Sequence, residues 1–430
     1  MIGKVRAPLS AIIFAVPPTV LPFPEARRIV EQHAAKLLPA RQPELLDIRE
    51  AGGRVLAEPI VADRDLPPFP RATRDGYAVR SNDLQTLPAH LEVIGEIKAG
   101  DSSEASSRQI ESGQAVAIMT GAPAPPGADA VVMVEYTTRD RDIVNVQRGV
   151  AAGENIVPRG AEGRAGEVLL QAGTMLSPAA IALAASVGKS QLHVYVPPKV
   201  AVLSTGDEIV DIATRPGPHQ IRNSNTFSLA AQIRAAGGIP TLLPIAPDKP
   251  GELKRLIEDG LRSDLLLIAG GVSMGKYDLV EQVLAEFEAE FFFTGALIQP
   301  GRPVVFGRAK STRGASPREI YFLGLPGNPV STLVTFDLFA RPLINALSGA
   351  GPGKLWLVQV RLKSDIKTKT GLTRFLPATL SGKFDQTEVE LVRWQGSGDI
   401  AAAARANCYL VVPPDRERIS AGEMVSVLLG

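Results

Sequence analysis

Three glycine-bearing loops in the second half of the chain each directly follow a short apolar run. They are Ser204-Thr-Gly-Asp-Glu208, Gly270-Gly-Val-Ser-Met-Gly275 and Gly324-Leu-Pro-Gly-Asn-Pro-Val-Ser331. Glycine lets a backbone approach a ligand closely and present its N–H groups, and ligands of parallel α/β sheets lie beyond the carboxyl ends of the strands. The loops therefore predict a ligand site at one edge of a parallel sheet.

The apolar runs before these loops are typical of strands that are buried on both faces. Residues 199–203, 264–268 and 319–323 are nearly continuous apolar stretches. Helical patterns accompany them over residues 226–236, 251–261 and 278–290. This alternation predicts a doubly wound parallel α/β domain over residues 197–347.

The third loop has the pattern of a strand-to-helix turn that can bind an anion. Asn328 is predicted to cap a helix that runs through Leu338, with Pro329 in its first turn. The positively polarised helix N-terminus, with Gly324 and Gly327 allowing close approach, would form a cradle for a phosphate or similar anion. A tight turn without any ligand explains the same Pro-Gly-Asn-Pro pattern.

Acidic residues gather around the loops. Asp207 and Glu208 lie in the first loop, Asp278 follows the second, and Asp248 follows another apolar run. Carboxylates beside a phosphate would repel it unless a cation lies between them, and Mg²⁺ binds both groups. The sequence therefore predicts a Mg²⁺ site. Taken singly, Asp278 also fits a helix cap, and each of the others fits a solvated loop acid.

Together these segments resemble the signatures of the molybdopterin molybdenumtransferase family, relatives of the catalytic domain of gephyrin. The resemblance rests on the second and third loops and on Thr205-Gly-Asp-Glu208, Asn223-Ser-Asn225 and Gln299-Pro-Gly-Arg-Pro303. Further family signatures follow in the family's order: Asp75-Gly-Tyr-Ala-Val79, Ile118-Met-Thr-Gly-Ala-Pro123, Gly127-Ala-Asp-Ala-Val-Val132, Gly153-Glu-Asn-Ile156 and Gly396-Ser-Gly398. The resemblance covers about residues 22 to 430.

The resemblance implies an enzyme that binds adenylylated molybdopterin and molybdate, hydrolyses the adenylate with Mg²⁺ and leaves molybdenum on the dithiolene. It also implies an elongated homodimer whose active cleft draws on both subunits. The catalytic residues that it implies are Asp75, Thr120, Glu208, Asp248 and Asp278, of which Glu208 and Asp278 also hold Mg²⁺. The implied substrate-binding residues are Gly206, Asp207, Ser224, Gly270, Gly271, Ser273, Gly275, Pro300, Arg302, Gly324, Pro326, Gly327, Asn328, Pro329 and Ser331.

Several positions depart from the family pattern. Glu162 stands where the family commonly has aspartate, and Gln299 and Arg302 stand where it often has two lysines. If the lost lysine weakens an anion site, Gln299→Lys should lower the molybdate concentration needed for half-maximal insertion. Arg71 and Arg74, ahead of Asp75, add two positive charges that can restore the lost attraction.

Two other functions fit parts of the sequence. One is a binding or scaffold protein of this fold that has lost turnover, with Gln299 and Ala161 as signs of decay. The other is a hydrolase of nucleotide pyrophosphates or nicotinamide nucleotides that shares only the α/β domain. Such a hydrolase would lack the Asp75-Gly-Tyr and Met119-Thr-Gly-Ala-Pro signatures.

Composition narrows the class of protein. The chain has 430 residues, 45% of them apolar, and a formal net charge of +1, which argues against a nucleic-acid partner. No apolar run approaches the roughly 20 residues of a membrane span. Cys408, the single cysteine, lies in an apolar run and is predicted to be a buried strand residue, and the four histidines have no zinc-ligand spacing. These features predict a cytoplasmic enzyme.

Prolines and glycines that interrupt the predicted helices and strands divide the chain into five parts. We predict an N-terminal extension (1–21) rather than a signal peptide, a helical linker domain in two segments (22–70 and 159–196), a small mostly-β domain (71–158), the α/β domain (197–347) and a C-terminal β-barrel-like domain (350–430). Within the linker domain, residues 23–38 and 44–56 are predicted helices, and Ser177 is predicted to cap a third.

Overall fold

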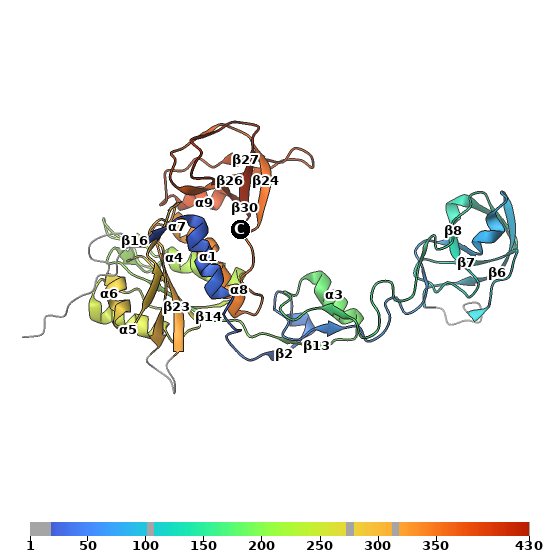
Figure 1. Cartoon of the computed structure of the whole chain (residues 1–430), viewed down its shortest axis with the longest axis horizontal. Helices are drawn as coiled ribbons and strands as arrows, with labels where there is room; N and C mark the ends of the chain where they lie inside the picture. Colours follow the sequence, from blue (N-terminus) through green and yellow to red (C-terminus); the bar gives the residue numbers. More distant parts are fainter. Residues whose placement is uncertain (1–18, 101–106, 272–278, 312–317, 430) are drawn as a thin grey trace, which may run out of the picture. The chain divides into compact units, whose positions relative to one another are not determined.

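The computed structural model describes residues 19–100, 107–271, 279–311 and 318–429 (Figure 1). The chain forms two compact units. The first unit comprises residues 1–46, 53–57 and 193–430, and the second comprises residues 47–52 and 58–192. This division is coarser than the five-part partition, whose boundaries stay a prediction.

The α/β domain of the first unit contains a mixed sheet. In their order across the sheet, its described strands are β17 (Ile239–Leu242), β14 (Lys199–Ser204), β18 (Leu265–Ala269), β23 (Arg318–Leu325), β22 (Val305–Ser311) and β19 (Glu290–Phe293). The first four strands are parallel, as the apolar runs predict. Beyond β23 the pairing is antiparallel, first between β23 and β22 and then between β22 and β19. The connection between β22 and β23 is too short for a parallel crossover, which needs about a dozen residues.

Helices cover both faces of this sheet, which makes the domain doubly wound as predicted. Alternate residues of β14 and β18 enter different cores: Val200, Val202, Leu265 and Leu267 face one core, and Ala201, Leu203, Leu266 and Ile268 face the other. The first core is covered by α1 (Phe23–Ala34), α4 (Asn225–Ala235) and α8 (Arg341–Leu347), and the second by α5 (Pro250–Gly260) and α6 (Leu279–Ala285), as Figure 1 shows.

A long apolar helix closes the first core. It begins as α7 (Pro329–Thr335), widens to a π-helical segment at Phe336–Ala340 and continues as α8. Among the described residues, this is the one helical stretch long and apolar enough to cross a membrane, but 83% of it is buried inside the protein. Pro342, four residues after Leu338, has no N–H to donate, and the Leu338 carbonyl instead accepts a hydrogen bond from the buried Arg27 guanidinium of α1.

The C-terminal domain is a closed five-stranded barrel, which confirms the barrel-like prediction. Around the ring its strands are β26 (Thr373–Ser381), β27 (Glu388–Leu391), β24 (Leu357–Leu362), β30 (Met424–Leu429) and β28 (Cys408–Val412), which returns to β26. Cys408 is buried in β28 as predicted. The short strand β21 (Ile298–Gln299) joins the barrel by pairing with β26, and α9 (Ile400–Arg405) packs against β26.

The second unit is mostly β. Its main sheet contains, in order, the described strands β8 (Ala130–Met133), β5 (Gly76–Val79), β7 (Gln114–Ile118), β6 (Ala89–Ile97), β10 (Ile143–Val146) and β9 (Thr137–Asp140). Two short strand pairs, β4 (Arg71–Ala72) with β11 (Ile156–Val157) and β3 (Ile60–Val61) with β12 (Val168–Leu170), and the helix α3 (Pro178–Ser186) complete it. Ser177 Oγ accepts a hydrogen bond from Ala180 N at 3.2 Å, which confirms the predicted cap.

Three predicted helices need correction. Residues 44–56 are not a helix: they form strand β2 (Glu44–Asp47) and a 3₁₀ turn at Ile48–Glu50. Strand β2 pairs with β13 (Gln191–Val194), which is distant in sequence, and the Asp47 carboxylate caps the 3₁₀ turn by accepting from Arg49 N at 2.9 Å. The helix predicted over 278–290 is α6 alone, because Glu290 already belongs to β19, and α1 ends at Ala34 rather than at residue 38.

The contact of Arg27 with the π-helical turn gives a first prediction. Arg27→Leu should lower the free energy of unfolding by about 1–3 kcal/mol, because it leaves the buried Leu338 carbonyl without its donor. Urea denaturation followed by circular dichroism measures the change. Arg28→Leu, on the exposed side of the same helix, is the control and should stay within about 0.5 kcal/mol of the parent. Equal losses in both variants would contradict the assignment.

Candidate functional site

A buried polar network fixes the first glycine loop. Ser204, the last residue of β14, bonds through Oγ to Asn223 Oδ1 at 3.2 Å and to Thr226 Oγ1 at 2.8 Å. Asn223 Oδ1 also accepts from Thr226 N at 3.2 Å, so it holds the start of α4. All three side chains are buried. The network therefore ties the carboxyl end of β14 to the N-terminus of α4.

The three loops contact one another through backbone groups. Gly270 N donates to Leu325 O at 3.0 Å, and a Cβ on Gly270 would lie 2.6 Å from Thr205 O, so glycine is required there for packing. Asn225 Nδ2 donates to Gly327 O at 2.7 Å. The first loop, the start of the second loop, the third loop and the N-terminus of α4 thus form one connected surface.

Three acidic residues of the predicted set lie in or beside the first loop: Asp207, Glu208 and Asp248. Asp248 N donates to Asp207 Oδ1 at 3.1 Å, and Thr205 Oγ1 donates to Asp248 Oδ1 at 3.1 Å. A Cβ on Gly206 would lie 2.4 Å from Glu208 Oε2, so the Glu208 carboxylate folds over the Gly206 backbone. Among the described residues, no group of three or more acidic, histidine or cysteine side chains is arranged to hold a metal ion by itself.

The third loop differs from its prediction. Asn328 is the N-cap residue of α7 and Pro329 follows it as expected, but the Asn328 side chain makes no capping bond. Its Nδ2 instead donates to Ser397 Oγ at 2.9 Å, and Val330 N donates to Ser397 O at 3.0 Å. Because a carbonyl oxygen of the Gly396-Ser-Gly398 loop already occupies this helix end, α7 offers fewer free N–H groups than predicted.

Gly324 is not part of a loop. It lies inside β23, where it pairs with Ile268 on one side and with Val305 on the other. Its backbone groups therefore belong to the sheet. Gly327, two residues beyond the end of β23, is exposed and remains available for a close approach.

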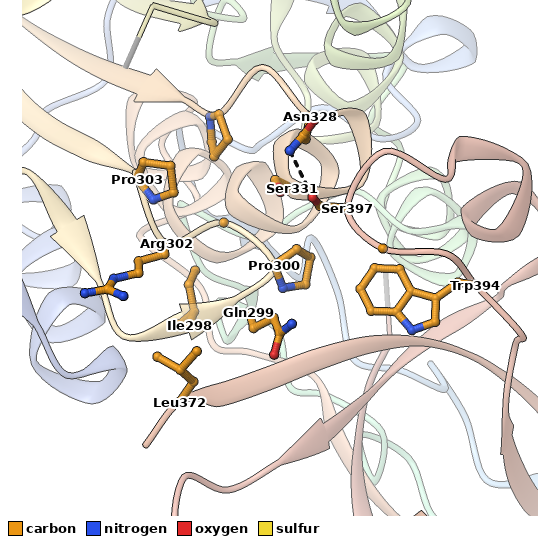
Figure 2. Close-up of a pocket in the computed structure, with 13 residues that line it drawn as sticks. Ile298, Gln299, Pro300, Arg302, Pro303, Asn328, Ser331, Leu372, Trp394 and Ser397 are labelled. Atoms are coloured by element: carbon orange, nitrogen blue, oxygen red, sulfur yellow. Dashed lines mark hydrogen bonds between the residues drawn. The ribbon is translucent and has the colours of Figure 1, made fainter. Parts of the chain in front are cut away.

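A pocket of about 280 Å³ lies where the α/β domain meets the C-terminal barrel (Figure 2). Its lining residues are Ile298, Gln299, Pro300, Gly301, Arg302, Pro303, Pro326, Asn328, Ser331, Leu372, Trp394, Gly396 and Ser397. Figure 2 shows the Asn328–Ser397 hydrogen bond on one side of Pro300 and the Gln299 amide on the other. None of these lining residues is acidic, and the one cationic residue among them is Arg302, whose guanidinium points away from Pro300 and Trp394 in Figure 2.

The pocket and the acidic loop, which we define as the first glycine loop together with Asp248, contain different residues of the predicted site. Pro300, Arg302, Pro326, Asn328 and Ser331 line the pocket. The residues Gly206, Asp207, Glu208, Ser224, Asp248, Gly270, Gly271, Gly324, Gly327 and Pro329 lie outside its lining, and most of them belong to the connected loop surface. Ser273, Gly275 and Asp278 lie outside the described residues, so their predicted roles stay predictions.

Asp75 and Thr120 belong to the second unit and contact each other. Asp75 Oδ1 accepts from Thr120 N at 2.6 Å and from Thr120 Oγ1 at 2.7 Å. The backbone hydrogen bond first, and the hydroxyl second, lower the pKa of the Asp75 carboxyl below its ordinary value. The pair therefore presents an ionised carboxylate held by a neighbouring threonine.

Two departures from the family pattern pair with each other in the second unit. Arg71 Nη2 lies 2.7 Å from Glu162 Oε1. This partly exposed ion pair offsets part of the charge of Arg71, and the role of the two arginines in attracting an anion stays a prediction. Arg74, directly before Asp75, is exposed.

Sequence reasoning missed several residues of this site. Asn225 and Ser397 lie in quoted motifs, yet their hydrogen bonds to the third loop were not predicted. The signal for both was an amide or hydroxyl group among small or polar residues at or just before the start of a helix. Trp394 and Leu372 carried no signal, because their place in the pocket depends on how the barrel packs against the α/β domain.

Comparison with known proteins matches almost the whole chain. Residues 21–188 match the MoeA N-terminal region (domain I and II), residues 201–346 the probable molybdopterin binding domain, and residues 359–429 the MoeA C-terminal region (domain IV). The molybdopterin molybdenumtransferase of Nostoc sp. is 35% identical over 422 residues, covering 95% of this chain and 94% of that protein. That of Haemophilus influenzae is 34% identical and covers 90% of this chain and 93% of that protein.

A solved structure agrees with these matches. The molybdopterin biosynthesis moeA protein from Pyrococcus horikoshii OT3 superposes with a TM-score of 0.73 at 30% identity, covering 96% of this chain and 100% of that chain. Fold and site thus define a multidomain protein in which an α/β domain of the molybdopterin-binding type shares a pocket with a C-terminal barrel. The chain belongs to the molybdopterin molybdenumtransferase family, a family of transferases.

The Asp75–Thr120 contact gives a second prediction. Thr120→Val removes the hydroxyl donor but keeps the backbone N–H, so the pKa of Asp75 should rise and still stay below its ordinary value. Because folding lowers this pKa, the carboxylate stabilises the fold at neutral pH, and this contribution is lost as pH falls through the lowered value. Carboxyl ¹³C NMR titration measures the shift.

Thr137→Val is the matched control for this titration. The Thr137 hydroxyl donates to Val134 O at 2.9 Å and makes no bond to Asp75, so its removal should leave the Asp75 titration unchanged. An unchanged Asp75 titration in Thr120→Val would show that the hydroxyl bond has no effect on the carboxyl.

Proposed function

We propose that this transferase inserts molybdenum from molybdate into adenylylated molybdopterin and hydrolyses the adenylate, releasing AMP and molybdenum cofactor. The proposal rests on one observation: the first unit of this chain contains two sites of opposite chemistry. One is a pocket lined by donors without a carboxylate, and the other is a loop surface that carries carboxylates.

The pocket has the chemistry for an oxyanion. Gln299, Asn328, Ser331 and Ser397 supply neutral polar groups, and the lining includes one cationic residue, Arg302. An oxyanion accepts hydrogen bonds and carries negative charge, so a lining with one cation, several donors and no carboxylate favours it. Molybdate, as a substrate, has this chemistry, and so does a phosphate of the pterin ligand.

The acidic loop has the chemistry for Mg²⁺. Asp207, Glu208 and Asp248 offer carboxylate oxygens at one loop, and each of Asp207 and Asp248 uses Oδ1 in a hydrogen bond that leaves Oδ2 for another partner. Mg²⁺ is usually held by one or two carboxylates plus substrate phosphates rather than by a complete protein cage, so these residues fit the ion. Together with Asp278, Glu208 would hold it, and bound Mg²⁺ would neutralise charge on the phosphates.

The chain's own residues orient the substrate in this proposal. The loop surface around Gly270, Gly271 and Gly327 lies against the start of α4, where Ser224 is the N-cap residue and can donate to a phosphate. Asp248 is held by Thr205 and can position a water molecule for attack on the adenylate. Asp75, ionised and held by Thr120, is proposed as a further catalytic carboxylate on the family resemblance.

The proposal includes a homodimer and a cytoplasmic location, with no nucleic-acid or membrane partner. The homodimer rests on the family resemblance, and the other two rest on composition.

If the active cleft draws on both subunits, two inactive variants should complement each other. Mixing Asp75→Asn protein with Glu208→Gln protein and allowing the subunits to exchange should restore part of the AMP release. Mixing two proteins that are altered in the same unit of the chain should not restore it.

The primary test is AMP release from adenylylated molybdopterin by the purified full-length chain with Mg²⁺, in the presence and absence of molybdate. Release that depends on molybdate supports the proposal. Tight binding of the ligand without release under either condition would favour the scaffold function instead.

The acidic loop gives a third prediction. Glu208→Gln keeps the shape of the side chain and removes one negative charge, so the Mg²⁺ concentration for half-maximal AMP release should rise about tenfold or more. Asp278→Asn should act in the same direction. The control is Glu286→Gln, an exposed acid that pairs with Lys254 and lies outside the site, and it should leave the Mg²⁺ dependence unchanged.

A further inference from the structure

The first described residues of the chain are built into the junction between the α/β domain and the barrel. Strand β1 (Val20–Leu21) pairs in parallel with β20 (Gly295–Ala296), which lies directly before β21. Thr294 N donates to Thr19 O at 3.0 Å, and Thr19 N donates to Thr294 Oγ1 at 2.9 Å. This short pairing joins two segments that lie 275 residues apart in the sequence.

Leu297 connects the pairing to the barrel. Its N–H donates to Leu21 O at 2.7 Å, and its carbonyl oxygen accepts from Thr373 N of β26 at 3.0 Å. The N-terminal strand and the barrel therefore meet on the two sides of one residue of the α/β domain. Since the lining of the pocket begins at the next residue, Ile298, this junction lies at the edge of the pocket.

Phe23, the first residue of α1, contacts both domains with its ring. The centroid of the ring lies 5.0 Å from that of Phe375 in the barrel and 6.3 Å from that of Phe339 in the π-helical segment. Both pairs are edge-to-face, an arrangement that attracts beyond the apolar area it buries. Phe375 and Phe339 are themselves buried, so the ring of Phe23 joins the interiors of the two domains.

This aromatic contact adds to a small apolar interface. At the pocket the barrel is held by the hydrogen bonds of Ser397 to the start of α7, and such bonds add little net stability because water can replace either partner. The barrel residues that reach the first core of the α/β domain are Phe375, Leu428, Tyr409 and Val411. Phe23 packs against this core from a third segment of the chain and enlarges the apolar contact.

We infer that residues 19–23, which we call the N-terminal clamp, hold the barrel onto the α/β domain and keep the two walls of the pocket in place. Phe23 is a positioning residue in this arrangement, because it is not among the residues that line the pocket and acts through Phe375. The clamp has two strand residues followed by Pro22, so it can open by local unfolding while both domains stay folded. For its effect on catalysis the inference rests on the proposed function.

The amide of Val330 reports whether the barrel is in place. Val330 follows Pro329 in the first turn of α7, where N–H groups have no partner within the helix. Its N–H donates to Ser397 O of the barrel, so its protection from hydrogen exchange depends on the contact between the domains. The amide of Leu362 is the internal reference, because it donates to Glu423 O at 2.8 Å inside the barrel.

The test is hydrogen exchange of the full-length chain, read at single residues by mass spectrometry. Phe23→Ala should speed exchange at Val330 about tenfold and leave Leu362 unchanged, because the barrel separates more often but stays folded. Phe23→Leu keeps most of the apolar contact and should restore most of the protection. The control Phe291→Ala removes a half-buried ring that packs on Phe322 in the second core, and it should leave both amides unchanged.

Three results would overturn the inference. The first is unchanged exchange at Val330 in Phe23→Ala. The second is that Phe291→Ala speeds exchange at Val330 as much as Phe23→Ala does. The third is equal acceleration at Val330 and Leu362, which would mean that the barrel itself unfolds.

Thr294→Val keeps the test decisive if Phe23→Ala does not fold. The substitution preserves the shape of the side chain and removes the acceptor of Thr19 N, so it loosens the strand of the clamp without touching its ring. Exchange at Val330 should be faster than in the parent chain, with Leu362 unchanged. Parent-like exchange at Val330 in a folded Thr294→Val chain would contradict the inference.

AMP release gives a second readout. Phe23→Ala should raise the molybdate concentration for half-maximal release about fivefold with little change in the maximal rate, since fewer chains have both pocket walls in place at one time. The exchange measurements use no substrate. The expected exchange pattern in a chain that never releases AMP would refute the proposed function and leave the clamp intact. Molybdate-dependent release together with unchanged exchange at Val330 in Phe23→Ala would refute the clamp alone.

Discussion

The parallel pairing of β14, β18 and β23 is the constraint on which the site depends. Because these strands run in the same direction and lie side by side, their carboxyl ends leave the sheet at one edge. Their side chains alternate between two cores that are sealed by helices, so the strands are fixed from both faces. The strand ends from which the loops start are therefore fixed in place.

The loops are then held by polar groups rather than by burial. Asn223 and Asn225 act from the start of α4, one on the first loop and one on the third. Ser397 reaches from the barrel to the start of α7, through both its hydroxyl and its carbonyl oxygen. Each of these bonds satisfies a backbone or amide group that would otherwise need water, which leaves other groups of the same loops available for a ligand.

The sequence predicted the architecture well because local patterns determine it. Continuous apolar runs identified β14, β18 and β23, and the Ser-Pro pair at residues 177–178 identified the start of α3. Residues 44–56 were wrongly predicted as a helix, because Glu44–Asp47 pairs as a strand with β13, whose residues 191–194 lie far along the chain. The pocket was beyond prediction, since the partners of Gln299 and Asn328 are Arg374 and Ser397, about 70 residues further along the chain.

The shared pocket makes barrel docking and ligand binding coupled equilibria. Its walls come from the α/β domain at residues 298–303 and 326–331 and from the barrel at residues 372 and 394–397. A ligand that contacts both walls binds only the docked arrangement, and so it must stabilise docking by the same free energy by which docking improves its affinity. The fraction of molecules in which the barrel is separated from the α/β domain would then be lower with ligand bound than without it. Barrel docking would therefore report whether the pocket contains a ligand.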